Sequence, residues 1–253
     1  MLDTLILFTF PFLASFLSII FNLPGFYSIF LFLGFPSLYL TFRSHKNVTR
    51  IALFSLLFTI PVTLVFDYIM QVSLVWKVAT IYNFKAFGVV PIEQFVWGFL
   101  YMYLSAMYYK YFLDKKTKRH VGFRDKFLAI GFLGWLFGMA AVILILLNFG
   151  IVVPYLYIVL GVLFFIAQFI IFFKLHPQLA HKILRTVPYN FVVALIFEIT
   201  ALYLQQWSWP GNTYIGWVEF LSLRFPLEEF IFYLILGSAV VLMYFELLAD
   251  DLE

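Results

Sequence analysis

Long runs of apolar residues alternate with short polar segments along most of the chain. About 20 consecutive apolar residues are enough to cross the hydrocarbon core of a bilayer as a helix. By this criterion the pattern predicts an all-α integral membrane protein with about eight transmembrane helices, over residues 3–21, 25–42, 51–70, 89–111, 127–148, 154–173, 187–205 and 226–247. The two longer segments between them, 71–88 and 206–225, are expected to be loops.

The composition supports this prediction and excludes several other classes of protein. Hydrophobic residues make up 64% of the chain and charged residues 11%, whereas about 25% of residues are charged in a typical soluble domain. The absence of cysteine excludes disulfides and thiolate ligands. Aromatic residues reach 23%, which is more than interfacial belts need. That excess fits a flat or polyene ligand, or phenylalanine used as lipid-facing filler.

The basic residues are distributed unequally between the two sides that the eight helices define. Cytoplasmic loops of membrane proteins are enriched in Lys and Arg. Three basic residues fall on one side, and 13 of the 16 fall on the other: Arg43, Lys46, Arg50, Lys110, Lys115, Lys116, Lys118, Arg119, Arg124, Lys126, Lys174, Lys182 and Arg185. We therefore expect a multi-pass protein of the plasma membrane with both termini in the cytoplasm. The lipid bilayer is an expected partner, and nucleic acid is not.

Residues recur in the same order in the two halves of the chain at a nearly constant spacing. Six pairs of residues show this recurrence. Four pairs are 131 residues apart: Arg43/Lys174, His45/His176, Asp67/Glu198 and Trp76/Trp207. Two pairs are 135 residues apart: Pro91/Pro226 and Glu93/Glu228. The recurrence predicts two four-helix repeats, 1–112 and 127–253, joined by a basic linker at 113–126. Repeats with an even number of helices insert in the same orientation, which predicts a pseudo-two-fold axis along the membrane normal.

The repeat places five acidic residues at one depth near the non-cytoplasmic helix ends: Asp67, Glu93, Glu198, Glu228 and Glu229. An ionisable side chain in the middle of a membrane helix costs about 2.5–3.5 kcal/mol on insertion scales, so such residues are functional candidates. The alternative is a capping role, because an acid in the first turn of a helix interacts favourably with the helix dipole.

Two short motifs within this pattern resemble a known family. The motif Pro-Leu-Glu-Glu-Phe at 226–230, its partial copy Pro-Ile-Glu-Gln-Phe at 91–95, and the spacing from Asp67 to Trp76 are similar to the non-flavin, membrane-embedded lycopene cyclases. Members of that family occur as paired small subunits or as fused single chains, and this chain resembles the fused form.

The resemblance implies a carotenoid end-group cyclase, an intramolecular lyase or isomerase that closes lycopene ψ ends into β-ionone rings without a metal or another cofactor. It implies acid and base roles for Glu228, Glu229 and Glu93. The repeat extends the catalytic candidates to Asp67 and Glu198. Trp76 and Trp207 are candidates for substrate contact, although their role could instead be structural. The remaining motif residues are also candidates for substrate contact: Pro91, Gln94, Phe95, Pro226 and Phe230. Gln94 departs from the family pattern, which usually has a second acid there.

Other functions stay open or fit poorly. A non-catalytic carotenoid- or isoprenoid-binding protein and a small-molecule transporter are the alternatives. Every Lys lies in a predicted loop or at a helix end, so a retinal Schiff base is disfavoured. Asp250 and Asp251 are poorly suited to hold a prenyl diphosphate with Mg²⁺. Gly134 and Gly138 form a Gly-x-x-x-Gly pattern, which is typical of helix–helix contact.

Overall fold

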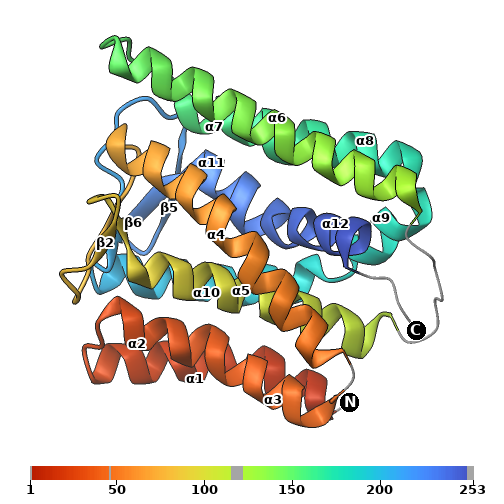
Figure 1. Ribbon diagram of the computed structural model, residues 1–253. Helices are drawn as coiled ribbons and strands as arrows, with labels where there is room; N and C mark the ends of the chain where they lie inside the picture. The colour runs from red at the N-terminus through yellow and green to blue at the C-terminus, as the bar shows by residue number, and fades with distance from the viewer. Residues whose placement is uncertain (1, 46, 115–121, 250–253) are drawn as a thin grey trace.

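Helices dominate the computed structural model, which describes residues 2–45, 47–114 and 122–249 (Figure 1). In chain order they are α1 (Leu2–Ile20), α2 (Gly25–Ile29), α3 (Phe35–Arg43), α4 (Val48–Val72), α5 (Ile92–Phe112), α6 (Phe123–Asn148), α7 (Leu156–Leu160), α8 (Ala167–Leu175), α9 (Pro177–Leu184), α10 (Val187–Tyr203), α11 (Leu227–Glu229) and α12 (Ser238–Leu248). Three π-helical segments, η1 (Phe30–Gly34), η2 (Gly161–Ile166) and η3 (Phe230–Gly237), continue α2, α7 and α11.

Six helical runs in the described part of the chain are long and apolar enough to cross a membrane: Leu2–Ile20, Gly25–Arg43, Val48–Val72, Phe123–Asn148, Leu156–Leu175 and Leu227–Leu248. A seventh results if α9 and α10, which meet at 43°, form one span. The chain is therefore a membrane protein by length and composition of its helices. Helix α5 is 21 residues long, but its five tyrosines, Glu93, Gln94 and Lys110 make it less apolar than the other runs.

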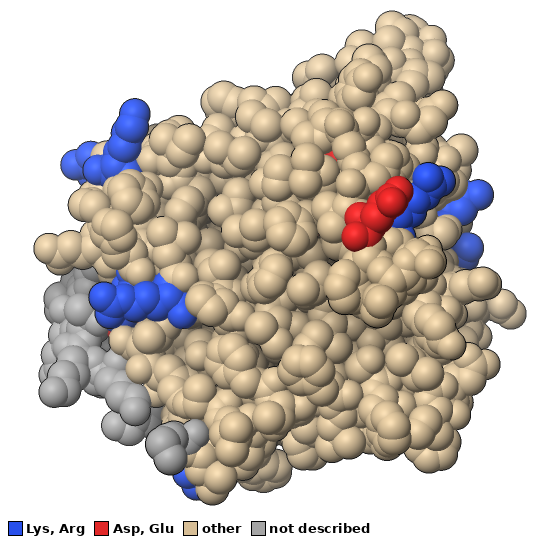
Figure 2. All heavy atoms as spheres, turned by 180° about the vertical axis from the view of Figure 1, so that it is seen from behind, with Lys and Arg blue, Asp and Glu red and all other residues tan. Residues whose placement is uncertain are grey.

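The outer surface of the bundle matches this assignment. Figure 2 shows Lys, Arg, Asp and Glu side chains mostly near two opposite ends of the visible face, with a broad uncharged band between them. Large apolar side chains such as Phe12, Phe16 and Ile145 are more than half exposed on α1 and α6. Lipid is the solvent in which such a surface is stable. Helix α12, by contrast, is almost entirely buried in the centre of the bundle.

The prediction of an all-α chain is wrong in the two long connections, which contain short strands. They are β1 (Lys77–Val78), β2 (Lys85–Ala86), β3 (Val90–Pro91), β4 (Trp207–Ser208), β5 (Trp217–Phe220) and β6 (Leu223–Pro226). Strands β2 and β3 form one antiparallel hairpin, and β5 and β6 form another. Strand β1 pairs with β4, which joins the two connections directly. These segments are rich in aromatic and β-branched residues, which favour strands.

Several local features recur at the spacing seen in the sequence. Helices α2 and α7 begin at Gly25 and Leu156, and both lead into a π-helical segment. The left-handed backbone of Leu74 recurs at Gln205, each with φ of 55°. In the ladder between β1 and β4, Lys77 lies opposite Ser208. Each of these three pairs of positions is 131 residues apart.

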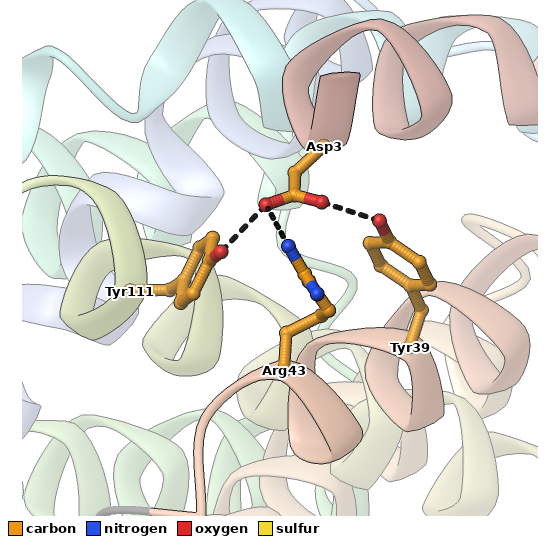
Figure 3. Close-up of polar contacts among 4 residues, drawn as sticks. All are labelled: Asp3, Tyr39, Arg43 and Tyr111. Carbon is orange, nitrogen blue, oxygen red and sulfur yellow. Dashed lines mark hydrogen bonds and ion pairs between the residues drawn. The ribbon is translucent and has the colours of Figure 1, made fainter. Parts of the chain in front are cut away.

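A polar cluster ties three helices together at the end of the bundle where α1 begins (Figure 3). The Asp3 carboxylate accepts hydrogen bonds from the hydroxyls of Tyr39 at 2.5 Å and Tyr111 at 2.6 Å, and from the guanidinium of Arg43 at 3.1 Å. These donors come from α3 and α5. Charged hydrogen bonds are stronger than neutral ones, so the cluster fixes α1 against the rest of the bundle.

Two other expectations from the sequence need correction. Helix α6 begins at Phe123, so the end of the predicted 113–126 linker is helical. Five of the predicted cytoplasmic basic residues lie outside the described residues: Lys46, Lys115, Lys116, Lys118 and Arg119. A Cβ added at Gly134 or Gly138 would meet no atom within 4 Å, so the prediction that these glycines mediate helix contact is wrong within the described chain. The close approach lies instead at Gly161, where an added Cβ would lie 2.0 Å from the ring of Phe232.

Candidate functional site

A cavity of about 170 Å³ lies among α4, α5, η2, η3 and the two strand-bearing connections. Most of its lining is aromatic or aliphatic. Its carboxyl and carboxamide groups are those of Asp67, Gln94 and Glu229. The surrounding aromatic side chains are Phe58, Phe66, Trp76, Trp97, Tyr101, Tyr157, Phe164, Phe165, Trp207, Trp209 and Tyr233. The arrangement is an apolar chamber with carboxyl groups in its wall, which is the usual composition of a small-molecule site.

In the first half of the chain, two N–H groups hold one carboxylate in place. The indole of Trp76 donates to Asp67 Oδ1 at 3.3 Å, and the Gln94 side chain donates to the same oxygen at 2.9 Å. Asp67 comes from the last turns of α4, Gln94 from the first turn of α5, and Trp76 from the connection between them. Hydrogen bonds from N–H donors favour the charged form of a carboxyl group.

The second half repeats the first of these contacts. The indole of Trp207 donates to Glu198 Oε1 at 3.1 Å, just as Trp76 donates to Asp67. Trp209 adds a second indole donor to the same oxygen at 3.3 Å. Glu198 is fully buried and its Oε2 has no hydrogen-bond partner among the described residues. It lies behind the cavity wall rather than in the lining.

Glu229 occupies the place in the second motif that Gln94 occupies in the first. It accepts a hydrogen bond from the hydroxyl of Tyr157, and its side chain reaches the cavity. Glu229 is only 8% exposed, and its carboxyl group carries an exchangeable proton when it is neutral. The two motif copies therefore contribute chemically different groups to one chamber.

The first glutamates of the two motifs have another role. The backbone N–H of Ile81 donates to Glu93 Oε1 at 2.9 Å, and the Thr80 hydroxyl donates to the same atom at 2.7 Å. The backbone N–H of Ile215 donates to Glu228 Oε1 at 2.7 Å. Both carboxyl groups are buried, and neither lines the cavity. They hold the connection that precedes their own helix, and a catalytic role for Glu93 or Glu228 stays a prediction.

Aromatic faces surround the carboxyl groups. Trp97 and Tyr101 stack with ring centroids 5.4 Å apart, and Tyr233 packs against both at 5.2 and 5.3 Å. Elsewhere in the lining, Tyr157 stacks against Trp209 with ring centroids 6.1 Å apart. The negative face of an aromatic ring attracts cations, so such a chamber stabilises positive charge on a bound molecule.

The connection above the cavity is also held by specific contacts. The hydroxyl of Tyr214 donates to the carbonyl of Val75 in the opposite connection and accepts from the N–H of Gly211 at 3.2 Å. Burial raises the pKa of Tyr214 to about 12, so this residue stays a neutral hydrogen-bond donor at physiological pH. The contact with Val75 adds to the β1–β4 ladder in joining the two connections.

The structure separates the residues predicted to contact substrate into two groups. Trp76, Trp207 and Gln94 line the cavity. The other four do not: Pro91 and Pro226 precede the first turns of α5 and α11, Phe230 packs its edge against Phe191, and Phe95 lies outside the lining. For those four, contact with a substrate stays a prediction that this cavity does not support.

Several lining residues were not singled out from the sequence. Tyr157, the partner of Glu229, is 72 residues away in the chain, and no local pattern distinguishes it from the other 15 tyrosines. Trp209 is 131 residues after Val78, which also lines the cavity, so a search of the repeat for unmatched aromatic residues would have found it. Trp97, Tyr101 and Tyr233 follow the two motifs at helical spacing.

No protein-family model matches the chain, and no match was found among curated proteins or solved structures.

Proposed function

We propose that this chain is a carotenoid end-group cyclase that converts lycopene ψ ends to β-ionone rings by proton-initiated, redox-neutral cyclisation. The observation that carries the proposal is the pairing of two buried carboxyl groups, Asp67 and Glu229, in the wall of one aromatic cavity. The motif resemblance supplies the reaction class.

The proposed architecture is two parallel four-helix repeats with eight spans in the plasma membrane and both termini in the cytoplasm. The recurring indole–carboxylate contacts of Asp67 and Glu198 support the repeat, because both join residues nine positions apart in corresponding connections. The recurring π-helical segments and the Lys77–Ser208 register support it independently. The count of eight spans treats α5 and the α9–α10 pair as one span each.

The chemistry begins with a proton. Transfer of a proton from Glu229 to the terminal double bond of a ψ end leaves a tertiary carbocation on the more substituted carbon. The next double bond supplies its electron pair to that carbon, which closes the six-membered ring and moves the charge into it. Loss of a proton to a carboxylate then forms the ring double bond. The substrate gains one proton from Glu229 and loses one to the base, so it is isomerised without a change of formula or charge. No electrons are exchanged with a cofactor, and transfer of a proton back to Glu229 resets the site.

The hydrogen bonds suggest which group has which role. Asp67 accepts two N–H donors, which favour a carboxylate and hence the base. Within the described residues, Glu229 accepts only one hydrogen bond, from the Tyr157 hydroxyl, and has both Glu198 and Asp67 as neighbouring acids. Like charges that are close together and poorly solvated rarely ionise together, so one member of such a pair keeps its proton. We assign Glu229 as the proton donor.

The remaining lining fits the intermediate. A carbocation in the chamber would lie among the aromatic rings of Trp97, Tyr101, Tyr157, Trp209 and Tyr233. A desolvated cation–π contact contributes about 2 kcal/mol. The scarcity of polar lining atoms protects the cation from capture by water.

Expression of the chain in a bacterial host that accumulates lycopene tests the proposal. Chromatography of the extracted pigments is expected to show γ- or β-carotene, formed without added cofactor. Unchanged lycopene, despite membrane expression verified by immunoblot, would contradict it. If lycopene then co-purifies with the solubilised protein unaltered, the cavity belongs to a non-catalytic carotenoid-binding protein.

A further inference from the structure

In each of the two β-hairpins, the turn begins with a large apolar residue whose backbone is left-handed. Phe87 follows β2 with φ of 50°, and Leu221 follows β5 with φ of 49°. Both side chains are 76% exposed. The two positions lie in corresponding connections of the two halves of the chain, each shortly before its Pro-containing motif.

This choice of residue is unfavourable for the turn itself. Leu221 and Ser222 alone connect Phe220 to Leu223, and both have positive φ. Two-residue turns of this kind strongly favour Asn-Gly or Asp-Gly, since a residue with a bulky side chain is strained in the left-handed region. In water, an exposed leucine at this position would add a solvation cost to the strain.

The neighbouring side chains have the composition of a membrane interface. Phe84 and Phe220 are 65% and 50% exposed beside the two tips. Lys85 and Arg224 are exposed on the same hairpins. Arg224 lies 4.6 Å from the ring centroid of Trp217 and opposite the exposed Glu219 in the strand register. Aromatic rings and basic side chains together are typical of segments that lie at the headgroup level.

The place of the hairpins in the bundle agrees with this composition. Figure 1 shows them at the same end as the connection from α6 to α7. In that connection Phe149 and Val152 are 74% and 78% exposed. Exposed apolar residues at a helix end indicate that this level of the molecule is in contact with lipid. The hairpin tips therefore continue an apolar rim.

We propose that the tips of the β2–β3 and β5–β6 hairpins insert into the headgroup–acyl boundary of the non-cytoplasmic leaflet. Phe87 and Leu221 contact lipid there, and Lys85 and Arg224 pair with lipid phosphates. Each hairpin leads directly into the helix that carries Gln94 or Glu229, so the insertion fixes the depth of the cavity wall relative to the bilayer. This proposal rests on the membrane-spanning helices, takes the leaflet from the proposed orientation, and does not depend on the proposed cyclase activity.

The absence of native cysteine makes the test direct. Phe87→Cys and Leu221→Cys are each labelled with a nitroxide in nanodiscs that contain phosphatidylglycerol. Asn212→Cys, at an exposed polar position of the second connection, is the control. Phe84→Cys and Phe220→Cys give each hairpin a second site, and gel filtration verifies that each variant is folded.

Power-saturation electron paramagnetic resonance then compares collisions of each label with oxygen and with a water-soluble nickel chelate. The labels at both tips are expected to gain oxygen collisions and lose nickel collisions relative to the label at Asn212. A tip label that is as accessible to nickel as the Asn212 label would overturn the proposal for that hairpin.

Discussion

Gln94 donates its side-chain N–H to Asp67 across 2.9 Å, whereas Glu229, in the same place of the second motif, accepts a hydrogen bond from Tyr157. An amide holds a neighbouring carboxylate but cannot supply a proton to a substrate. The difference between Gln94 and Glu229 thus makes the proposed site asymmetric. In this account one half orients the base and the other half carries the acid.

Changing Gln94→Glu is expected to lower the conversion of lycopene at neutral pH. The introduced carboxyl would share a proton with Asp67, because two carboxylates this close do not both ionise. Removal of a general base lowers rates by about 10²–10⁴-fold, and partial loss of the base is expected to cost at least tenfold. Product is measured by chromatography at matched expression. Conversion equal to or above that of the unaltered protein would show that the asymmetry has no catalytic role.

Glu93→Gln is the matched control for that experiment, since it changes the adjacent residue outside the cavity lining. The amide oxygen can still accept the hydrogen bonds from Ile81 and Thr80. We expect conversion within about twofold of the unaltered protein, because only a neutral acceptor is needed there. Glu93→Leu, which removes the acceptor, should lower the thermal stability in detergent. Loss of activity in Glu93→Gln with stability preserved would assign chemistry to Glu93.

Gly161→Ala is expected to destabilise the protein and reduce its activity together. The new methyl group would lie 2.0 Å from the ring of Phe232, which packs against Tyr157 at the cavity. Overpacking of this kind typically costs about 1–3 kcal/mol. Thermal unfolding in detergent measures the effect.

The control, Gly134→Ala, places its methyl group in open space on α6 and is expected to be neutral or slightly stabilising. Equal melting temperatures for the two variants would show that the close approach of η2 and η3 is not as tight as described.

The Asp3 cluster is expected to contribute to stability without affecting the site. Asp3→Asn weakens the interactions with Tyr39, Arg43 and Tyr111. A neutral amide replaces the charged hydrogen bonds of the carboxylate with weaker ones, so the free energy of unfolding should fall. Denaturant titration measures it, with Thr9→Ala as the control, since that hydroxyl bonds only within α1. Equal stability of the two variants would show that the cluster is not a structural tie.

The hydrophobic pattern located most of the long helices, because lipid-facing and buried positions of a spanning helix are both apolar. The length of each apolar run is then enough to distinguish a span from a loop. The repeat spacing singled out Asp67 and Trp76, but it did not predict that the Trp76 indole donates to the Asp67 carboxylate. The strands and the roles of the two adjacent glutamates were beyond reach of that pattern. Glu228 and Glu229 have similar sequence surroundings, and only the fold decides which one meets Ile215 and which one meets Tyr157.

The most direct test of the account compares Glu229→Gln with Glu228→Gln in the lycopene-accumulating host. Both variants remove one buried carboxyl, but the amide at position 228 can still accept the hydrogen bond from Ile215, whereas the amide at position 229 cannot donate a proton to the substrate. We predict that Glu229→Gln accumulates only lycopene, while Glu228→Gln still forms cyclic carotenoid. Cyclic product from Glu229→Gln, or its loss from a stable Glu228→Gln alone, would contradict the assignment of Glu229 as the acid.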